Sequence, residues 1–109
     1  MNATSHIVDP LKNGLVLDVV IEDLQFRAYV VISEPDINLV TGFVPEEQFQ
    51  QDGDVHVAAI GRSQDAREQI EDIAFNMNPG DAAVFLCSDK QAYAAALEEL
   101  GQVPPERLN

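Results

Sequence analysis

The chain has 109 residues, 46% of them hydrophobic, and its 19 acidic residues against six Lys and Arg give a formal net charge of −13. This length predicts one domain, and the apolar fraction is too high for an intrinsically disordered chain. So large a negative charge disfavours direct binding to nucleic acid or to an anionic membrane, and it favours a basic partner.

Cysteine usage and the first residues bear on location. A single cysteine, Cys87, excludes an intrachain disulfide and fits a reducing compartment. Residues 1–10 lack the basic and apolar stretches of a secretion signal. No apolar run approaches the roughly 20 residues that a membrane-spanning helix needs. We therefore expect a cytoplasmic protein.

The chain divides into three parts by pattern. Residues 1–13 are polar and lack periodicity, which predicts a flexible N-terminal arm. Residues 14–101 contain all the periodic stretches and predict a single α+β domain. Residues 102–109 follow a helix stop and include two consecutive prolines, which predicts a C-terminal tail.

A β-hairpin is predicted near the start of the domain. Residues 15–21 and 26–32 both alternate between apolar and polar side chains. Folding the chain at residues 23–24 pairs Ile21 with Phe26 and places the apolar side chains of both strands on one face.

The same register places Asp18 opposite Tyr29 on the outer face, diagonal to Arg27. After the turn signal Glu34-Pro35-Asp36, weaker alternation over residues 37–44 predicts a third strand. Pro45 with two following acids predicts one or two helical turns over residues 45–51.

The second half reads as strand, helix, strand, helix. Residues 55–60 predict a strand, and 63–78 a helix that Pro79-Gly80 ends. The continuous apolar run 82–87 is typical of a strand covered on both faces. Ser88 with Gln91 predicts a capping box at the start of the last helix. The buried stripe of this helix consists of Tyr93, Ala96, Leu97 and Leu100, and Gly101 is the predicted stop.

The helix over 63–78 has a clear buried side. Its apolar stripe consists of Ala66, Ile70, Ile73, Ala74 and Met77. Phe75 lies about 180° from this stripe, so it is either covered by another element or exposed. Together the elements predict one mixed sheet of about five strands with two helices on one face. The predicted order along the chain is a β-hairpin, a third strand, and then β-α-β-α.

Few residues suggest catalysis or metal binding. Cys87 ends a buried strand, and His56 alternates with its valine neighbours, so we interpret both as structural. Asp52-Gly53-Asp54 resembles the start of a calcium loop, but Ser63 occupies the twelfth position where a bidentate Glu is needed. We expect no enzyme activity, no metal and no cofactor.

One anion-binding alternative remains open. Gly61-Arg62-Ser63 runs from a strand into a helix, and Arg67 follows one turn later. Free N–H groups and two guanidinium groups at such a position bind phosphate or carboxylate. The alternative interpretation is that Arg67 pairs with Glu71 and Arg62 with a nearby acid.

The acidic loops are the feature that favours a function. From residue 28 to residue 61 there are six acids and no Lys or Arg. We interpret these acids as a partner-binding set: Glu34, Asp36, Glu46, Glu47, Asp52 and Asp54. Spaced carboxylates attract basic surfaces and can imitate phosphates. The same acids could instead serve solubility alone.

The leading hypothesis is a non-catalytic binding protein of the inhibitor, immunity or anti-defence type, from a bacterium or phage, that occupies a basic surface. Two alternatives are an anion-binding domain or small enzyme that uses Arg62, Ser63 and Arg67, and a structural subunit that dimerises through Phe75 or a sheet edge. The expected state is monomer or homodimer.

Overall fold

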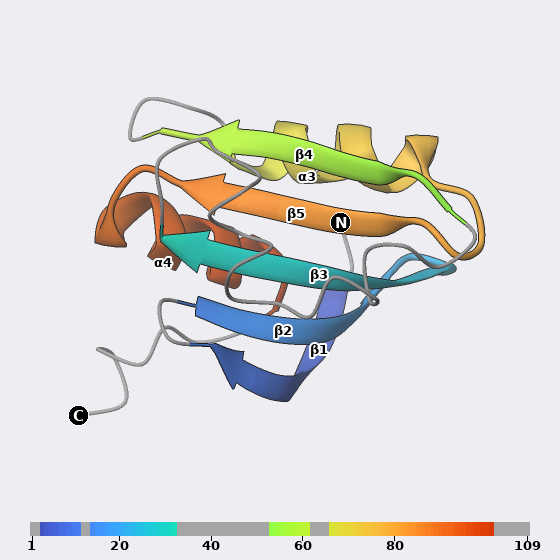
Figure 1. The fold of residues 1–109 in the computed structure, drawn as a ribbon, viewed down its shortest axis with the longest axis horizontal. Coiled ribbons are helices and arrows are strands. Elements are labelled where there is room, and N and C mark those ends of the chain that lie inside the picture. Colours follow the sequence, from blue (N-terminus) through green and yellow to red (C-terminus); the bar gives the residue numbers. More distant parts are fainter. Residues whose placement is uncertain (1–2, 12–13, 33–52, 62–65, 102–109) are drawn as a thin grey trace.

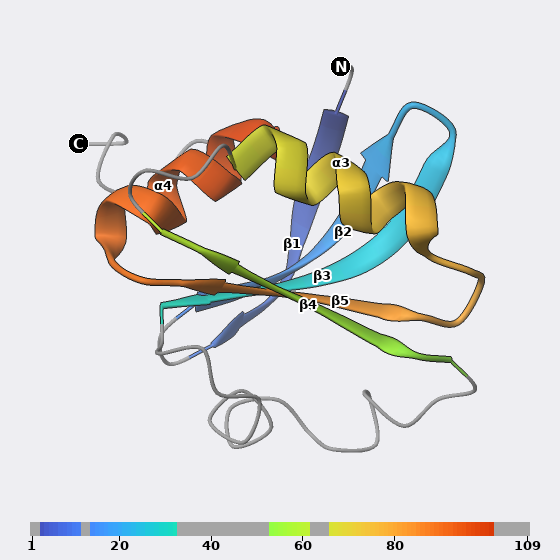
Figure 2. The same cartoon turned by 90° about the horizontal axis from the view of Figure 1, so that it is seen from above.

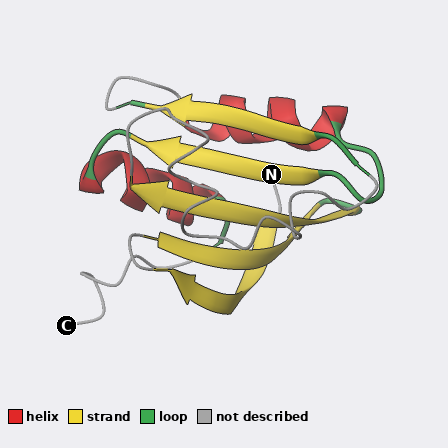
Figure 3. Cartoon of the chain, viewed as in Figure 1, coloured by secondary structure: helices red, strands yellow, loops and turns green. Residues whose placement is uncertain are grey.

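In the part of the chain that the structure describes, five strands form one open mixed sheet, and two helices pack on one of its faces (Figures 1 and 3). The computed structural model describes residues 3–11, 14–32, 53–61 and 66–101. The elements are β1 (Ala3–Leu11), β2 (Gly14–Ile21), β3 (Leu24–Ile32), β4 (Val55–Ile60), α3 (Ala66–Asn76), β5 (Ala82–Cys87) and α4 (Lys90–Glu99). The predicted α+β class with two helices on one face is therefore confirmed.

The sheet order is β1-β2-β3-β5-β4. β1, β2 and β3 form an antiparallel meander, and β5 runs parallel to both β3 and β4. The last strand of the chain thus lies between two earlier ones. The segment from β4 through α3 to β5 has the predicted order strand, helix, strand, and its two strands are parallel neighbours.

The first strand corrects the expectation of a flexible arm over residues 1–13. Residues 3–11 are paired with β2 along its length, with a bulge between Ile7 and Asp9. The bulge displaces the alternation by one residue, so the segment shows no regular period in the sequence. The predicted third strand at 37–44 and the helical turns at 45–51 lie outside the described residues.

The hairpin of β2 and β3 forms, but its register is shifted by two residues from the prediction. Ile21 pairs with Leu24, and Val19 pairs with Phe26. The turn contains only Glu22 and Asp23, because Glu22 adopts a positive φ of 55° that permits a tight connection. A shift of two leaves every side chain on its predicted face.

The new register also changes one cross-strand pair. Asp18 lies opposite Arg27 instead of Tyr29. Arg27 Nε donates to Asp18 Oδ1 at 3.0 Å, and both side chains are about two-fifths exposed. This hydrogen bond raises the pKa of the Arg27 guanidinium.

All six residues of β5 are buried, which confirms the strand covered on both faces. Side chains of β5 alternate between two apolar clusters. Ala83, Phe85 and Cys87 face the helices. Val84 and Leu86 join a second cluster on the opposite face, where burial raises the pKa of Tyr29.

The helices bury the stripes that the sequence predicted. Ala66, Ile70 and Ala74 of α3 and the stripe of α4 pack on the sheet beside each other, as Figure 2 shows from above. The N-cap of α4 is Asp89, not Ser88: its carboxylate accepts the N–H of Ala92 at 2.9 Å.

The C-terminal end of α4 is as predicted. Gly101 follows the helix with a positive φ of 86°, and its N–H donates to the carbonyl of Glu98. On α3, Phe75 is 62% exposed, which decides between the two alternatives for this residue.

Candidate functional site

The predicted partner-binding acids fall mostly outside the described residues. Glu34, Asp36, Glu46, Glu47 and Asp52 are all in the span 33–52, so their grouping stays a prediction. Asp54 is described: it immediately precedes β4, and its side chain is exposed.

Asp54 leads to a second acid, Asp81, that the sequence analysis did not single out. Asp81 lies just before β5, and its side chain is only 4% exposed. Its Oδ1 accepts the backbone N–H of Asp54 at 2.8 Å. Its Oδ2 accepts the backbone N–H of Asn78 at 2.9 Å and Nε2–H of His56 at 2.6 Å. The carboxylate therefore joins the starts of β4 and β5 to the loop after α3.

These contacts keep Asp81 ionised. The N–H of Asn78, the His56 imidazole and the N–H of Asp54, in that order, lower the pKa of the Asp81 carboxyl. An ionised Asp81 only accepts hydrogen bonds, so the proton of the short contact must sit on Nε2 of His56. The contact thus makes Nε2 the donor and fixes the orientation of the ring.

Two glycines allow the backbones to approach at this junction. A Cβ on Gly53 would overlap with the backbone of Gly80 and would lie 2.5 Å from the amide nitrogen of Asp81. Gly80 itself has a positive φ of 94° in the turn after α3. A side chain at position 53 cannot be accommodated without moving one of the two segments.

His56 and Cys87 do not form a catalytic pair. In the β4–β5 register His56 lies beside Ala83, four residues before Cys87, which is about 13 Å along the strand. Cys87 is buried, and burial raises the pKa of its thiol to about 12. The thiol is therefore protonated at neutral pH and is a core side chain, as interpreted from the sequence.

The anion-binding alternative loses one of its residues. Arg67 Nε donates to Glu71 Oε1 at 2.9 Å, one turn further along α3. Arg62 and Ser63 lie outside the described residues. Arg67 is thus already engaged in the pair that the sequence offered as the alternative interpretation.

Comparison of the chain with protein-family models, with curated proteins and with solved structures gave no significant match. The described residues contain no group of three or more His, Cys, Asp or Glu placed to hold a metal ion. Nor does this part of the chain include a helix long and apolar enough to cross a membrane.

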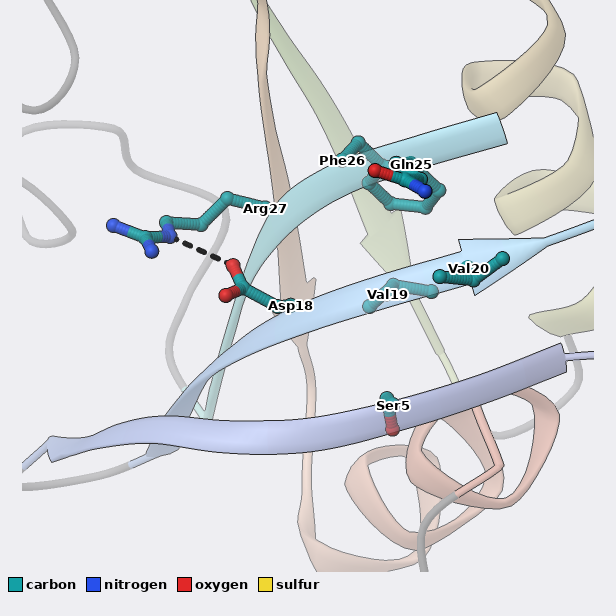
Figure 4. Close-up of a pocket in the computed structure, with 7 residues that line it drawn as sticks. All are labelled: Ser5, Asp18, Val19, Val20, Gln25, Phe26 and Arg27. Carbon is teal, nitrogen blue, oxygen red and sulfur yellow. Dashed lines mark hydrogen bonds and ion pairs between the residues drawn. The ribbon is translucent and has the colours of Figure 1, made fainter. Parts of the chain in front are cut away.

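Two surface hollows meet along the first half of β3. The larger, about 590 Å³, is lined by Ser5, Asp18, Val19, Val20, Gln25, Phe26 and Arg27. Figure 4 shows the Asp18–Arg27 pair reaching toward each other across its edge. Because these two charges neutralise each other, this hollow offers little electrostatic selectivity.

The second hollow, about 370 Å³, lies between the β2–β3 turn and the loop from α3 to β5. We call it the turn–loop pocket. Its lining residues are Asp23, Leu24, Gln25, Phe26, Arg27, Ala74, Met77, Asn78, Pro79, Gly80 and Asp81. It adjoins the Asp54–Asp81 junction and includes carboxylates without a matching number of cations.

Proposed function

We propose that this protein is a non-catalytic acidic binding module that occupies a basic surface of a partner protein, in the manner of an inhibitor, immunity or anti-defence protein. One observation carries the proposal. Of the three Lys and Arg residues in the described ranges, two are paired with acids of the same chain: Arg27 with Asp18, and Arg67 with Glu71. The same ranges contain 12 acidic residues.

This arrangement leaves carboxylates as most of the charged groups available to a partner in the described ranges, where Lys90 is the third and exposed cation. Intramolecular pairing neutralises two cations that would otherwise repel a basic surface or attract an acidic one. A surface of one sign accelerates association with an oppositely charged partner and makes association sensitive to salt. A nucleic-acid-binding surface is one such partner, since spaced carboxylates resemble a row of phosphates.

A non-catalytic role is supported by the state of the reactive side chains. The Cys87 thiol is buried and protonated, and His56 is held by Asp81 far from it. Neither forms the nucleophile–base contact that covalent catalysis requires.

The test is capture of a partner on the immobilised protein from an extract of the source cell, at about 50 mM and about 500 mM NaCl. We expect a partner with a basic surface, retained only at the lower salt. A four-site variant then removes the acidic loop charges: Glu46→Gln, Glu47→Gln, Asp52→Asn and Asp54→Asn.

A matched control removes four helix acids instead: Glu68→Gln, Asp72→Asn, Glu98→Gln and Glu99→Gln. The loop variant should lose binding and most of its salt dependence, and the helix variant should lose much less. Unchanged binding and salt dependence in the loop variant would contradict the proposal.

Dimerisation through Phe75 or a sheet edge remains a separate hypothesis. Phe75 is 62% exposed and so is accessible to a second copy of the chain, but a single exposed apolar side chain is common on monomers and only a contiguous apolar patch marks an interface. Sedimentation that gives a monomer at high protein concentration removes it.

A further inference from the structure

The turn–loop pocket combines an apolar floor with an acidic rim. Leu24, Phe26 and Met77 are partly buried side chains that also pack on the core, and Ala74 is fully buried beneath them. Figure 2 places the β2–β3 turn and the end of α3 at the same end of the molecule. The volume of about 370 Å³ lies within the usual range for ligand pockets.

Its electrostatic field is negative. Asp23 lines the pocket and is exposed, and Asp81 lines it as an ionised carboxylate. The C-terminal end of α3, which has no basic residue in its last turn, points its carbonyl groups to the same region. Arg27 also lines the pocket, but its guanidinium group is paired with Asp18.

These features define the chemistry of an occupant. An anion is repelled by the rim, and a purely apolar group makes no use of the Asp23 carboxylate. A long side chain with an apolar stem and a cationic head satisfies both parts of the pocket. Lysine and arginine have this form, and arginine additionally stacks on aromatic rings such as Phe26.

We propose that the turn–loop pocket binds an arginine side chain from an extended segment of the partner protein. The stem lies over Leu24 and Met77, and the guanidinium group pairs with Asp23 at the mouth. This inference rests on the proposed function, and it names the surface and the side chain through which a basic partner is recognised.

The probe is a blocked pentapeptide, Gly-Leu-Arg-Leu-Gly, titrated into the 15N-labelled full chain and followed by amide chemical shifts. Two matched peptides replace arginine by lysine or by citrulline, which keeps the shape and removes the charge. We expect shifts at Leu24, Met77 and Gly80, and affinities in the order arginine, lysine, citrulline. Loss of the charge should weaken binding about five-fold.

Two pocket variants and one control localise the site. Asp23→Asn and Met77→Gln should each weaken the arginine peptide about three- to five-fold. Glu68→Gln removes the same charge from the first turn of α3, nine residues or about 13 Å from Met77, and should leave affinity unchanged. Circular dichroism of each variant confirms that the fold is retained.

Three results overturn the pocket proposal: no shift at saturating peptide, equal binding of the citrulline peptide, or equal weakening by Glu68→Gln and Asp23→Asn. Shifts at these residues from free spermine that match those from the peptide would assign the pocket to small cations instead. In each case salt-sensitive capture of a whole partner, lost in the four-site loop variant, still supports the proposed function. If the peptide binds as expected but no partner is captured in a salt-sensitive way, the pocket proposal is supported and the proposed function is contradicted.

Discussion

Adding one methyl group at Gly53 tests the junction between the starts of β4 and β5. In Gly53→Ala the new Cβ would lie 2.5 Å from the amide nitrogen of Asp81, whereas ordinary contacts begin near 3.4 Å. The two segments must therefore separate by at least about 0.9 Å, because the backbone of Gly80 is closer still. Both neighbours at the contact are backbone, so no side-chain rotation relieves the overlap.

The separation also strains hydrogen bonds across the junction. The N–H of Asp54 donates to Asp81 at 2.8 Å, and the N–H of Ala82 donates to the carbonyl of Asp54 at 3.0 Å. Overpacking costs about 1–3 kcal/mol, and we expect the upper half of that range because these bonds lengthen as well. For a domain of this size, about 2 kcal/mol lowers Tm by roughly 8 °C.

Urea unfolding followed by far-UV circular dichroism measures this loss. Asp54→Ala is the control, because the Asp54 side chain is exposed and its removal leaves the contact between the two backbones intact. The free energy of unfolding of this control should stay within about 0.5 kcal/mol of the parent protein. If Gly53→Ala is as stable as this control, the close approach of the two segments is wrong.

Four further predictions follow from other parts of the fold. Asp81→Asn should lower Tm at pH 7, and this loss of Tm should shrink as pH falls below about 4. The reason is that the native pKa of the Asp81 carboxyl is lowered, so the group stabilises the fold above its unfolded pKa of about 3.9. The stabilisation disappears as the carboxyl becomes protonated in the folded state. Thermal melts of both proteins from pH 3 to pH 7 check this, and a deficit independent of pH contradicts it. Glu22→Gly should stabilise the hairpin turn by up to about 1 kcal/mol because Glu22 has a positive φ, while Asp23→Gly should not; urea midpoints compare them. Phe75→Ser should change the free energy of unfolding by less than about 0.5 kcal/mol, since the ring is exposed; a larger loss in chemical denaturation would place the ring in a contact. Cys87 should react with Ellman's reagent only after denaturation, because its thiol is buried with a pKa of about 12; rapid labelling of the native protein would contradict its position.

The elements of the second half were predictable because their patterns are strong. The stripe of α3 and the continuous run of β5 each have one structural interpretation at their length. Pro79-Gly80 predicted the end of α3 and Gly101 the end of α4, because proline disfavours a helical residue before it and glycine readily adopts a positive φ. Ser88 and Asp89 are both good N-cap residues one position apart, so sequence did not decide between them.

The first half was harder because local pattern and actual pairing differ there. The bulge in β1 obscures its alternation, and Pro10 disfavours a strand although it is tolerated at an edge such as β1. The β2–β3 register needed a non-glycine residue at positive φ, which sequence rules discourage. Each miss is a case in which tertiary pairing outweighed a local preference.

The candidate site was predictable only in part. Net charge pointed to a basic partner, and Asp54 was singled out from its loop position. Asp81 was missed because its partners, Asp54 and His56, are 27 and 25 residues away in the sequence. The available signal was the acid directly after Pro79-Gly80, where a turn brings a carboxylate back to the preceding backbone N–H groups.

The central place of β5 constrains how the molecule assembles during synthesis. When the ribosome has released β1 to β4, the meander can form by local contacts, but β3 and β4 each expose an open hydrogen-bonding edge. Only the arrival of residues 82–87 joins the two parts, at a separation of more than 50 residues from the paired positions in β3. Nascent or truncated chains that end before β5 should therefore depend on chaperones and be prone to aggregate through those edges.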